Sequence, residues 1–224
     1  PGAGVRAVRR PLRRPGPAAP SRPREPMVCH RGGVDGDRTG DPAVTGGWRC
    51  LAAVDVHYPS GGGARAALVT SADPRFATIA AEHVAHLDQV APYRPGAFYA
   101  RELPALRAVL ALVGTPAPDL LVVDGYVDLD PDGRPGLGAH AHAEFGVPVI
   151  GVAKTAFRGA THAVEVRRGA ATRPLHVTAA GLDPADAATL VLRMAGPFRL
   201  PDALRRVDAL SRGRAGIPRQ QDTP

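Results

Sequence analysis

The sequence predicts an α/β fold in which helices flank a mixed β-sheet, with an antiparallel meander followed by parallel strands. The first observation is a strand–helix–strand pattern. The apolar, β-branched runs Leu120–Val123 and Val147–Val152 are typical of buried strands, and a helical pattern from Leu137 to Phe145 lies between them. Such a unit makes its two strands parallel. The second observation is a series of strand patterns between residues 51 and 84, which indicates the meander.

The meander is predicted from three runs, Leu51–Val56, Ala64–Thr70 and Phe76–Val84. Each run has the length and apolar content of a strand, and a Gly61-Gly62-Gly63 turn separates the first two. Asp55 lies inside the first run, where an acidic residue is unexpected.

A helix is predicted over Arg101–Val113, because apolar residues recur there at positions 103, 106, 109, 110 and 113. Pro104 fits the first turn of this helix, and Glu102 lies at its N-terminal end. The preceding segment Pro92-Tyr93-Arg94-Pro95-Gly96 predicts a rigid loop, since neither proline can continue a central strand.

After the strand–helix–strand unit, the pattern predicts two short strands and two helices. The strands are Ala163–Val166 and Pro174–Thr178, the first helix is amphipathic over Asp183–Met194, and the second covers Pro201–Leu210. Residues 48–212 therefore form one predicted domain, followed by a flexible tail at 213–224.

Residues 1–47 contain eight prolines and nine glycines without apolar periodicity. Such a composition cannot bury enough surface to offset the entropy of ordering, so this leader is expected to be disordered or to lie upstream of the true start. A basic arm that binds nucleic acid is the alternative. Of the formal net charge of +7, residues 1–48 carry +5, so the charge is weak evidence for nucleic-acid binding by the folded part.

The composition excludes several classes of protein. No run approaches the roughly 20 apolar residues that cross a bilayer, and the Arg/Pro-rich N-terminal region lacks the apolar core of a secretory signal. Cys29 and Cys50 do not make a disulfide framework. A cytoplasmic protein without membrane contact is the simplest interpretation, with a monomer as the default.

Three acids and one lysine are the candidates for chemistry. Asp124 and Lys154 each follow a buried strand, where ligand sites of α/β sheets lie, and Lys154 is the only lysine in the chain. Together with Asp55 and Glu102, Asp124 could make an oxygen-lined site that suits Mg²⁺ or Mn²⁺ and activates water for attack on a phosphodiester. Lys154 would neutralise charge on the phosphate. Taken singly, each acid could equally serve a turn or a helix terminus, and a lone lysine could arise by chance.

A set of six short motifs resembles the endonuclease V family, inosine-directed nucleases of the RNase H-like superfamily. Order and spacing both match over roughly residues 48–212. The motifs are VDV (54–56), PYRPG (92–96), RELP (101–104), LLVVDG (120–125), PVIGVAK (148–154) and FRLPDALRRVDALSR (198–212).

The resemblance implies an RNase H-like fold and a role for each matched residue. Asp55 and Asp124 would ligate Mg²⁺, for which Mn²⁺ could substitute, and Glu102 would complete the acidic cluster. Lys154 would contact the scissile phosphate or orient the water. Tyr93, between Pro92 and Pro95, would be the wedge that enters the duplex where the lesion base is displaced. The backbone of Gly125, Gly136 and Gly138 would shape the pocket for that base.

This chain also departs from the family pattern. Many members have histidines in a pattern like DGHGxxHP, whereas this chain reads DGYVDLDP, with Tyr126 and Asp130 at the two histidine positions. Where many members carry GHR or a nearby aspartate, Asp183 is the candidate substitute. His140 and His142 could compensate for the missing histidines, but their helical context predicts surface positions. The resemblance implies that metal binding is preserved, while lesion specificity and rate depend on these changes.

The leading hypothesis is a metal-dependent nuclease of DNA repair that nicks DNA on the 3′ side of deoxyinosine, leaving 3′-hydroxyl and 5′-phosphate ends. Its partner is single- or double-stranded DNA with a deaminated base, and inosine-containing RNA stays open as a substrate. One alternative is an RNase H-like nuclease of other specificity, in which Tyr93 is dispensable. The other is a catalytically impaired lesion-binding protein.

Overall fold

The computed structural model describes residues 47–92 and 98–214. The predictions for the leader (1–47) and the tail (213–224) therefore fall almost entirely outside the described residues, and Tyr93 and Pro95 lie outside them as well.

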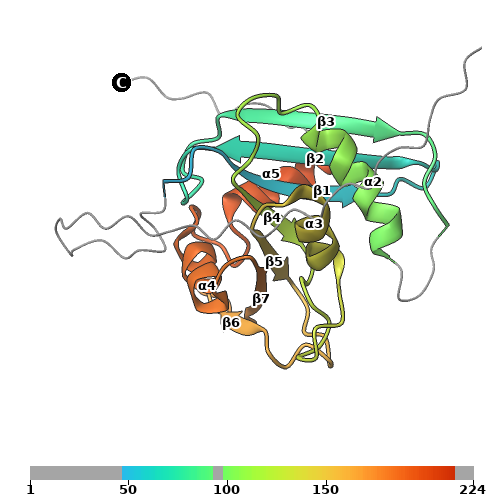
Figure 1. Cartoon of the computed structure of the whole chain (residues 1–224). Helices are drawn as coiled ribbons and strands as arrows, with labels where there is room; N and C mark the ends of the chain where they lie inside the picture. The colour runs from blue at the N-terminus through green and yellow to red at the C-terminus, as the bar shows by residue number, and fades with distance from the viewer. Residues whose placement is uncertain (1–46, 93–97, 215–224) are drawn as a thin grey trace, which may run out of the picture. The chain divides into compact units, whose positions relative to one another are not determined.

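The described residues build one seven-stranded sheet with the strand order β3-β2-β1-β4-β5-β7-β6. Strands β1, β2 and β3 pair antiparallel, β1, β4 and β5 pair parallel, and β5, β7 and β6 pair antiparallel. The predicted mixed sheet, with a meander followed by parallel strands, is thereby confirmed (Figure 1). The strands are β1 (Leu51–His57), β2 (Ala64–Ser71), β3 (Ala81–Leu87), β4 (Leu120–Asp124), β5 (Val149–Ala153), β6 (Val164–Val166) and β7 (Leu175–Ala180).

Helices cover both faces of the sheet. The four helices labelled in Figure 1 are α2 (Tyr99–Leu110), α3 (Leu137–Phe145), α4 (Pro184–Arg193) and α5 (Asp202–Ser211). Because side chains alternate along a strand, Leu51 and Ala53 of β1 join a core with α4 and α5, whereas Ala52 and Val54 join a second core with α2 and α3. The near-continuous apolar strands thus follow from burial on both faces.

The third strand was predicted too early. It was expected over Phe76–Val84 but covers Ala81–Leu87, because a turn precedes it. In this turn the Asp73 carboxylate accepts hydrogen bonds from two backbone N–H groups at 2.9 and 3.1 Å, and the Ser71 hydroxyl lies 2.8 Å from a backbone carbonyl oxygen. Phe76 has a left-handed backbone (φ 52°) and buries its ring in the core from the turn. Its apolar side chain therefore belongs to the core without belonging to a strand.

Helix α2 begins two residues before its predicted start and ends three residues before its predicted end. Glu102 lies in its first turn, as predicted, but Pro104 lies inside the helix rather than in that turn. The last residues expected in this helix form a turn that leads to Gly114, which has a left-handed backbone (φ 74°).

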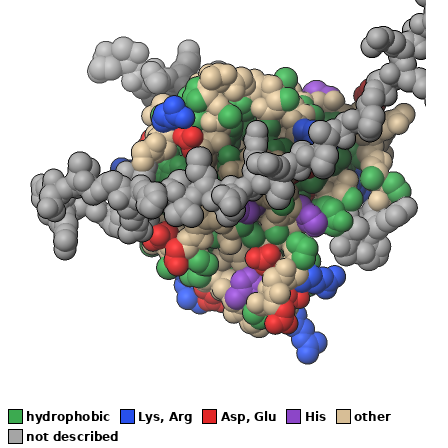
Figure 2. All heavy atoms as spheres, in the orientation of Figure 1, with side chains coloured by type: hydrophobic (Ala, Val, Ile, Leu, Met, Phe, Trp, Pro, Cys, Tyr) green, Lys and Arg blue, Asp and Glu red, His purple; other side chains and the backbone are tan. Residues whose placement is uncertain are grey.

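The face of the described residues that Figure 2 shows is not strongly basic. On the face that Figure 2 shows, the Lys and Arg side chains of the described residues are scattered, several of them next to acidic side chains. Within residues 47–92 and 98–214, no helix is both long and apolar enough to cross a membrane. Cys50 is a buried free thiol.

Candidate active site

Two of the predicted acids are neighbours at the carboxyl ends of adjacent parallel strands. Asp124 is the last residue of β4, and Asp55 lies near the end of β1. The parallel register places Val54 beside Val123, so the next residue of each strand, Asp55 and Asp124, follows on the same face. That face is the one covered by α5.

Glu102 reaches the same place from α2, which covers the opposite face. Its side chain is buried, with 7% of the residue exposed. Glu102, Asp55 and Asp124 line one cavity of about 10 Å³, a volume that accommodates a single water-sized species. The three predicted carboxylates therefore meet around one small cavity, although 47 residues separate Asp55 from Glu102 and 22 separate Glu102 from Asp124.

Burial makes Glu102 and Asp55 hold protons more tightly than usual. Burial, followed by the charges of Asp55 and Asp124, raises the pKa of Glu102 to about 8, against a smaller opposing effect of Arg101. Burial also raises the pKa of Asp55, and a hydrogen bond from Ser211 opposes this shift. A positive charge in this cavity would stabilise the ionised forms of both side chains.

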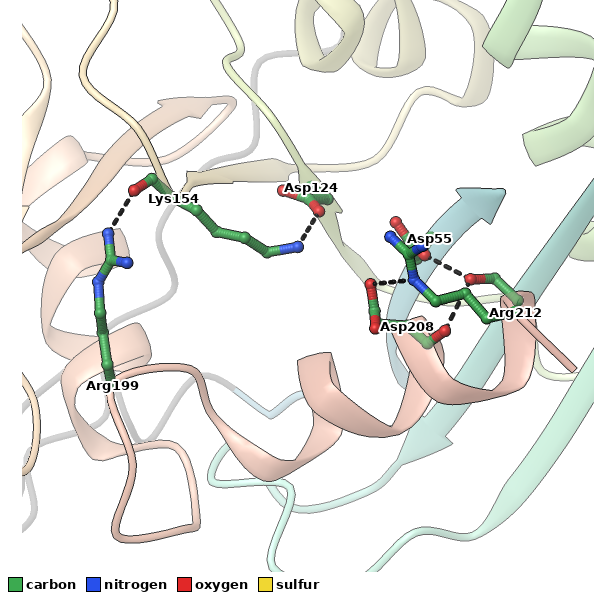
Figure 3. A network of polar contacts seen from close by, with 7 residues as sticks. Asp55, Asp124, Lys154, Arg199, Asp208 and Arg212 are labelled. Atoms are coloured by element: carbon green, nitrogen blue, oxygen red, sulfur yellow. Dashed lines mark hydrogen bonds and ion pairs between the residues drawn. The ribbon is translucent and has the colours of Figure 1, made fainter. Parts of the chain in front are cut away.

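Lys154 follows β5 and supplies the positive charge nearest to Asp124. Its Nζ donates a hydrogen bond to Asp124 Oδ2 at 2.6 Å, as Figure 3 shows. Burial alone would lower the pKa of Lys154, but the hydrogen bond and charge of Asp124 outweigh it and raise the pKa. The backbone carbonyl of Lys154 accepts a hydrogen bond from Arg199 Nη2, which also donates to the carbonyl of Pro174 at 2.7 Å. Lys154 is therefore fixed at both its ammonium group and its backbone carbonyl.

The structure adds residues of α5 that the sequence did not single out. The Ser211 hydroxyl donates a hydrogen bond to Asp55 Oδ2 at 2.6 Å. Asp208, whose charge also raises the pKa of Asp55, forms an ion pair with Arg212 at 3.0 Å (Figure 3). Helical spacing could have revealed Ser211 in the sequence. It lies four residues after the buried Val207 and therefore falls on the same face of α5.

Asp130 and Asp183 have structural contacts elsewhere. Asp183 caps α4, where its carboxylate accepts hydrogen bonds from two backbone N–H groups at 2.8 and 3.4 Å. Asp130 Oδ1 accepts a hydrogen bond from the backbone N–H of Arg134 at 2.9 Å and closes a turn. Neither residue lines the acidic cavity. Asp208 of α5 is the late acid whose charge acts on Asp55, whereas Asp183 caps α4, so a role for Asp183 in the site stays a prediction.

The two histidines expected on the surface are partly buried. The His140 ring stacks on Tyr99 with ring centroids 3.5 Å apart. His142 Nδ1 lies 2.7 Å from the carbonyl oxygen of Val147, just beyond the C-terminus of α3. Both side chains therefore have packing roles near α3.

A larger cavity of about 340 Å³ adjoins the acidic cavity and shares Glu102 and Asp124 with it. Gly125 and Gly136 line it, and a Cβ atom on Gly136 would lie 2.6 Å from the carbonyl oxygen of Tyr126. Gly138 instead packs against Val127. Pro92 is exposed, at the edge of the described residues. The aromatic residues that line the cavity are Phe98, Tyr99, Tyr126 and Phe157.

The donor set suits a hard divalent cation. Within residues 47–92 and 98–214, no group of three or more carboxylate, imidazole or thiol side chains is arranged to hold a metal ion. The chemistry nevertheless fits, because Asp55, Glu102 and Asp124 present only carboxylate oxygens to one cavity, and oxygen ligands are those that Mg²⁺ prefers.

We expect the substitution Glu102→Gln to stabilise the metal-free protein at alkaline pH. With a folded pKa of about 8, Glu102 keeps a proton that the unfolded chain, with a pKa near 4.5, releases. The unfolded state therefore binds fewer protons, and stability falls as the pH rises from about 4.5 to 8. The neutral amide removes this loss, which is on the order of 5 kcal/mol at pH 9, at about 1.4 kcal/mol for each pKa unit between 4.5 and 8. Thermal unfolding in EDTA at pH 5 and pH 9 measures it. A difference in unfolding temperature between Glu102→Gln and the wild type that is the same at pH 5 and at pH 9 would contradict the prediction.

Comparison with known proteins identifies the family. Residues 38–181 match the sequence model of endonuclease V. The chain is 36% identical over 218 residues to the endonuclease V of Streptomyces coelicolor, covering 88% of this chain and 91% of that protein. It is 33% identical over 165 residues to that of Thermococcus kodakarensis, covering 74% and 79%.

The fold agrees with solved structures of the same family. The crystal structure of Streptomyces avermitilis endonuclease V has a TM-score of 0.63 at 28% identity, covering 75% of this chain and 82% of that one. The Ciona intestinalis enzyme, solved with DNA containing an inosine followed by a ribo-adenosine, has a TM-score of 0.66 at 18% identity, with coverage of 75% and 85%. The chain therefore belongs to the endonuclease V family of metal-dependent nucleases, which hydrolyse phosphodiester bonds.

Proposed function

We propose that this protein is a DNA-repair endonuclease that nicks DNA on the 3′ side of deoxyinosine. The observation that carries the proposal is the sharing of Glu102 and Asp124 between the acidic cavity and the larger aromatic cavity. A displaced base could stack on aromatic side chains in the larger cavity while its phosphodiester lies at the acids. The related Ciona intestinalis structure contains DNA with an inosine. A monomeric state and a cytoplasmic location belong to the same proposal.

Asp55 and Asp124 would hold Mg²⁺, or Mn²⁺ in its place, with Glu102 completing the site. The ion, when bound, would activate water and stabilise charge on the phosphate oxygens. Ser211 keeps Asp55 Oδ2 in place through its 2.6 Å hydrogen bond. A cation would also offset the repulsion that Asp55 and Asp124 exert on Glu102.

Lys154 would neutralise the negative charge that develops on the phosphate. Its stem is anchored because Arg199 holds its backbone carbonyl, and its Nζ already lies beside Asp124. In the reaction, the oxygen of a water molecule bonds to phosphorus and the bond between phosphorus and the 3′ oxygen breaks. The water loses a proton and the 3′ oxygen gains one, which leaves 3′-hydroxyl and 5′-phosphate ends. An ammonium group beside the phosphate stabilises this transition state more than the substrate.

Recognition of the lesion would fall to the aromatic cavity and to the loop before α2. Gly125 and Gly136 line this cavity, and their backbone N–H groups already donate to the carbonyl oxygens of Val152 and Val127. These two glycines would therefore shape the backbone wall of the pocket for a displaced purine. Tyr93 on its proline-rich loop, outside the described residues, would replace the lost base stacking.

A labelled duplex with one deoxyinosine tests the function directly. In Mg²⁺ we expect a nick 3′ to the lesion and about 10²-fold less cleavage of the same duplex with deoxyadenosine at that position. EDTA should abolish the nick. Retained binding without any nick in Mg²⁺ or Mn²⁺ would identify a lesion-binding protein instead, and equal cleavage of both duplexes would identify a nuclease of other specificity. A single-stranded RNA with one inosine, run in parallel, decides between the two substrate classes.

A further inference from the structure

The hydroxyl of Tyr126 joins two segments that border the aromatic cavity. Tyr126 stands in the loop after β4, two residues beyond Asp124. Its hydroxyl donates a hydrogen bond to the carbonyl oxygen of Thr155 at 2.8 Å and accepts one from the backbone N–H of Phe157 at 2.9 Å. One side-chain oxygen thus fixes the conformation of the segment that follows Lys154.

This segment carries an aromatic ring to the cavity. Tyr126 and Phe157 both line the 340 Å³ cavity, with ring centroids 6.1 Å apart and planes inclined by 53°. Phe157 is 46% exposed, so burial in the core does not fix its position. The hydrogen bond from the Phe157 N–H to the Tyr126 hydroxyl, together with one that the Phe157 carbonyl accepts from the Ala160 N–H at 3.0 Å, sets the backbone from which the ring projects.

A second close approach keeps the same segment against the loop. A Cβ atom on Gly159 would lie 2.7 Å from the carbonyl oxygen of Leu129, and Leu129 also lines the cavity. The segment is therefore attached to the loop at Phe157, through the Tyr126 hydroxyl, and packed against it at Gly159. Of these two attachments, only the hydrogen bond to the Tyr126 hydroxyl can be removed by a single near-isosteric substitution, Tyr126→Phe.

We propose that Tyr126 is a positioning residue that holds Phe157 as a wall of the lesion-base pocket and thereby sets the preference for a planar base. This inference rests on the proposed function, because it assigns the aromatic cavity to a displaced purine. Stacking on an aromatic ring recognises a base by its flat face and is lost when the ring moves. The preference should therefore depend on the Tyr126 hydroxyl, even though that hydroxyl does not touch the base.

Binding measured in EDTA by fluorescence anisotropy tests the inference without requiring turnover. The probes are a duplex with one deoxyinosine and the same duplex with an abasic site there, which offers no base to stack. We expect the wild type to prefer deoxyinosine, and Tyr126→Phe to lose about tenfold of that preference, in line with the stacking energy of one base. Affinity for the abasic duplex should stay unchanged.

Two further variants separate positioning from a general loss of structure. Phe157→Leu should lose the same preference, and the double variant Tyr126→Phe/Phe157→Leu should lose no more than either single one, because both act on one wall. Tyr58→Phe is the matched control, since its buried hydroxyl has no hydrogen-bond partner among the described residues. It should bind both duplexes like the wild type.

The outcomes are distinguishable from those of the cleavage test. A Tyr126→Phe variant that keeps the preference, or a double variant that loses the product of the two single losses, would overturn the inference even if the wild type nicks deoxyinosine. A wild type that binds without preference would overturn it as well. A wild type that prefers deoxyinosine in EDTA but never nicks it would overturn the proposed function and leave the positioning role intact.

Discussion

Asp124→Asn is expected to lower the single-turnover rate of nicking at a deoxyinosine by about 10³-fold or more, the equivalent of several kcal/mol of transition-state stabilisation. Asp124 borders the acidic cavity, holds Lys154 at 2.6 Å and borders the aromatic cavity. The amide keeps the size of the side chain but removes its charge. It therefore weakens cation binding and releases the lysine at the same time.

The rate is measured with excess enzyme over a labelled duplex at several Mg²⁺ concentrations. Asp183→Asn is the matched control, because Asp183 caps α4 away from the acidic cavity and asparagine caps helices equally well. It should cut like the wild type and unfold at the same temperature. If Asp124→Asn nicks at the wild-type rate at every Mg²⁺ concentration, Asp124 is not part of the active site.

Lys154→Gln is expected to lower the same rate by about 10²-fold while leaving the affinity for Mg²⁺ within a few fold. Lys154 provides the ammonium group beside Asp124, and it follows β5, which pairs with β4, the strand that ends at Asp124. Glutamine fills the same space but cannot neutralise charge on the phosphate. The loss should therefore appear at saturating substrate and not in binding.

Lys154→Arg tests what kind of cation is needed. Arginine keeps the charge in a planar, wider group, so we expect it to recover only part of the rate. Because Lys154 is the only lysine in the chain, an amine-directed reagent modifies just this side chain and the N-terminus. Modification should inactivate the wild type and leave residual Lys154→Gln activity unchanged. If Lys154→Gln keeps full nicking activity, Lys154 has a structural role only and does not act on the phosphate.

Local sequence patterns predicted most of the fold. Apolar runs, turn glycines and helical spacing locate β1, β2, β4, β5 and the four helices of the described residues to within a few residues. They failed at Phe76, where the Ser71 hydroxyl donates a hydrogen bond to a backbone carbonyl and the Asp73 carboxylate accepts one from a backbone N–H, which closes a turn inside an apolar stretch. An apolar residue there serves the core equally from a turn or a strand, so its hydrophobicity could not distinguish the two.

The sequence by itself determined the part of the site that strand geometry fixes. Asp55, Asp124 and Lys154 each lie at or near the end of an apolar run, and parallel pairing brings such ends to one edge of the sheet. That edge could be deduced because it follows from strand direction alone. Glu102 could be added because it falls in the first turn of a helix with clear apolar periodicity.

Only the tertiary structure decided which distant residues complete the site. Ser211 meets Asp55 across 156 positions of the chain because burial of one apolar face docks α5 on β1. The same docking places Asp208 near Asp55, while Asp183 is used as a helix cap. The wall formed by Tyr126 and Phe157 likewise depends on a hydrogen bond across 31 positions. Such contacts result from how the elements pack, and short-range patterns in the sequence carry no record of that packing.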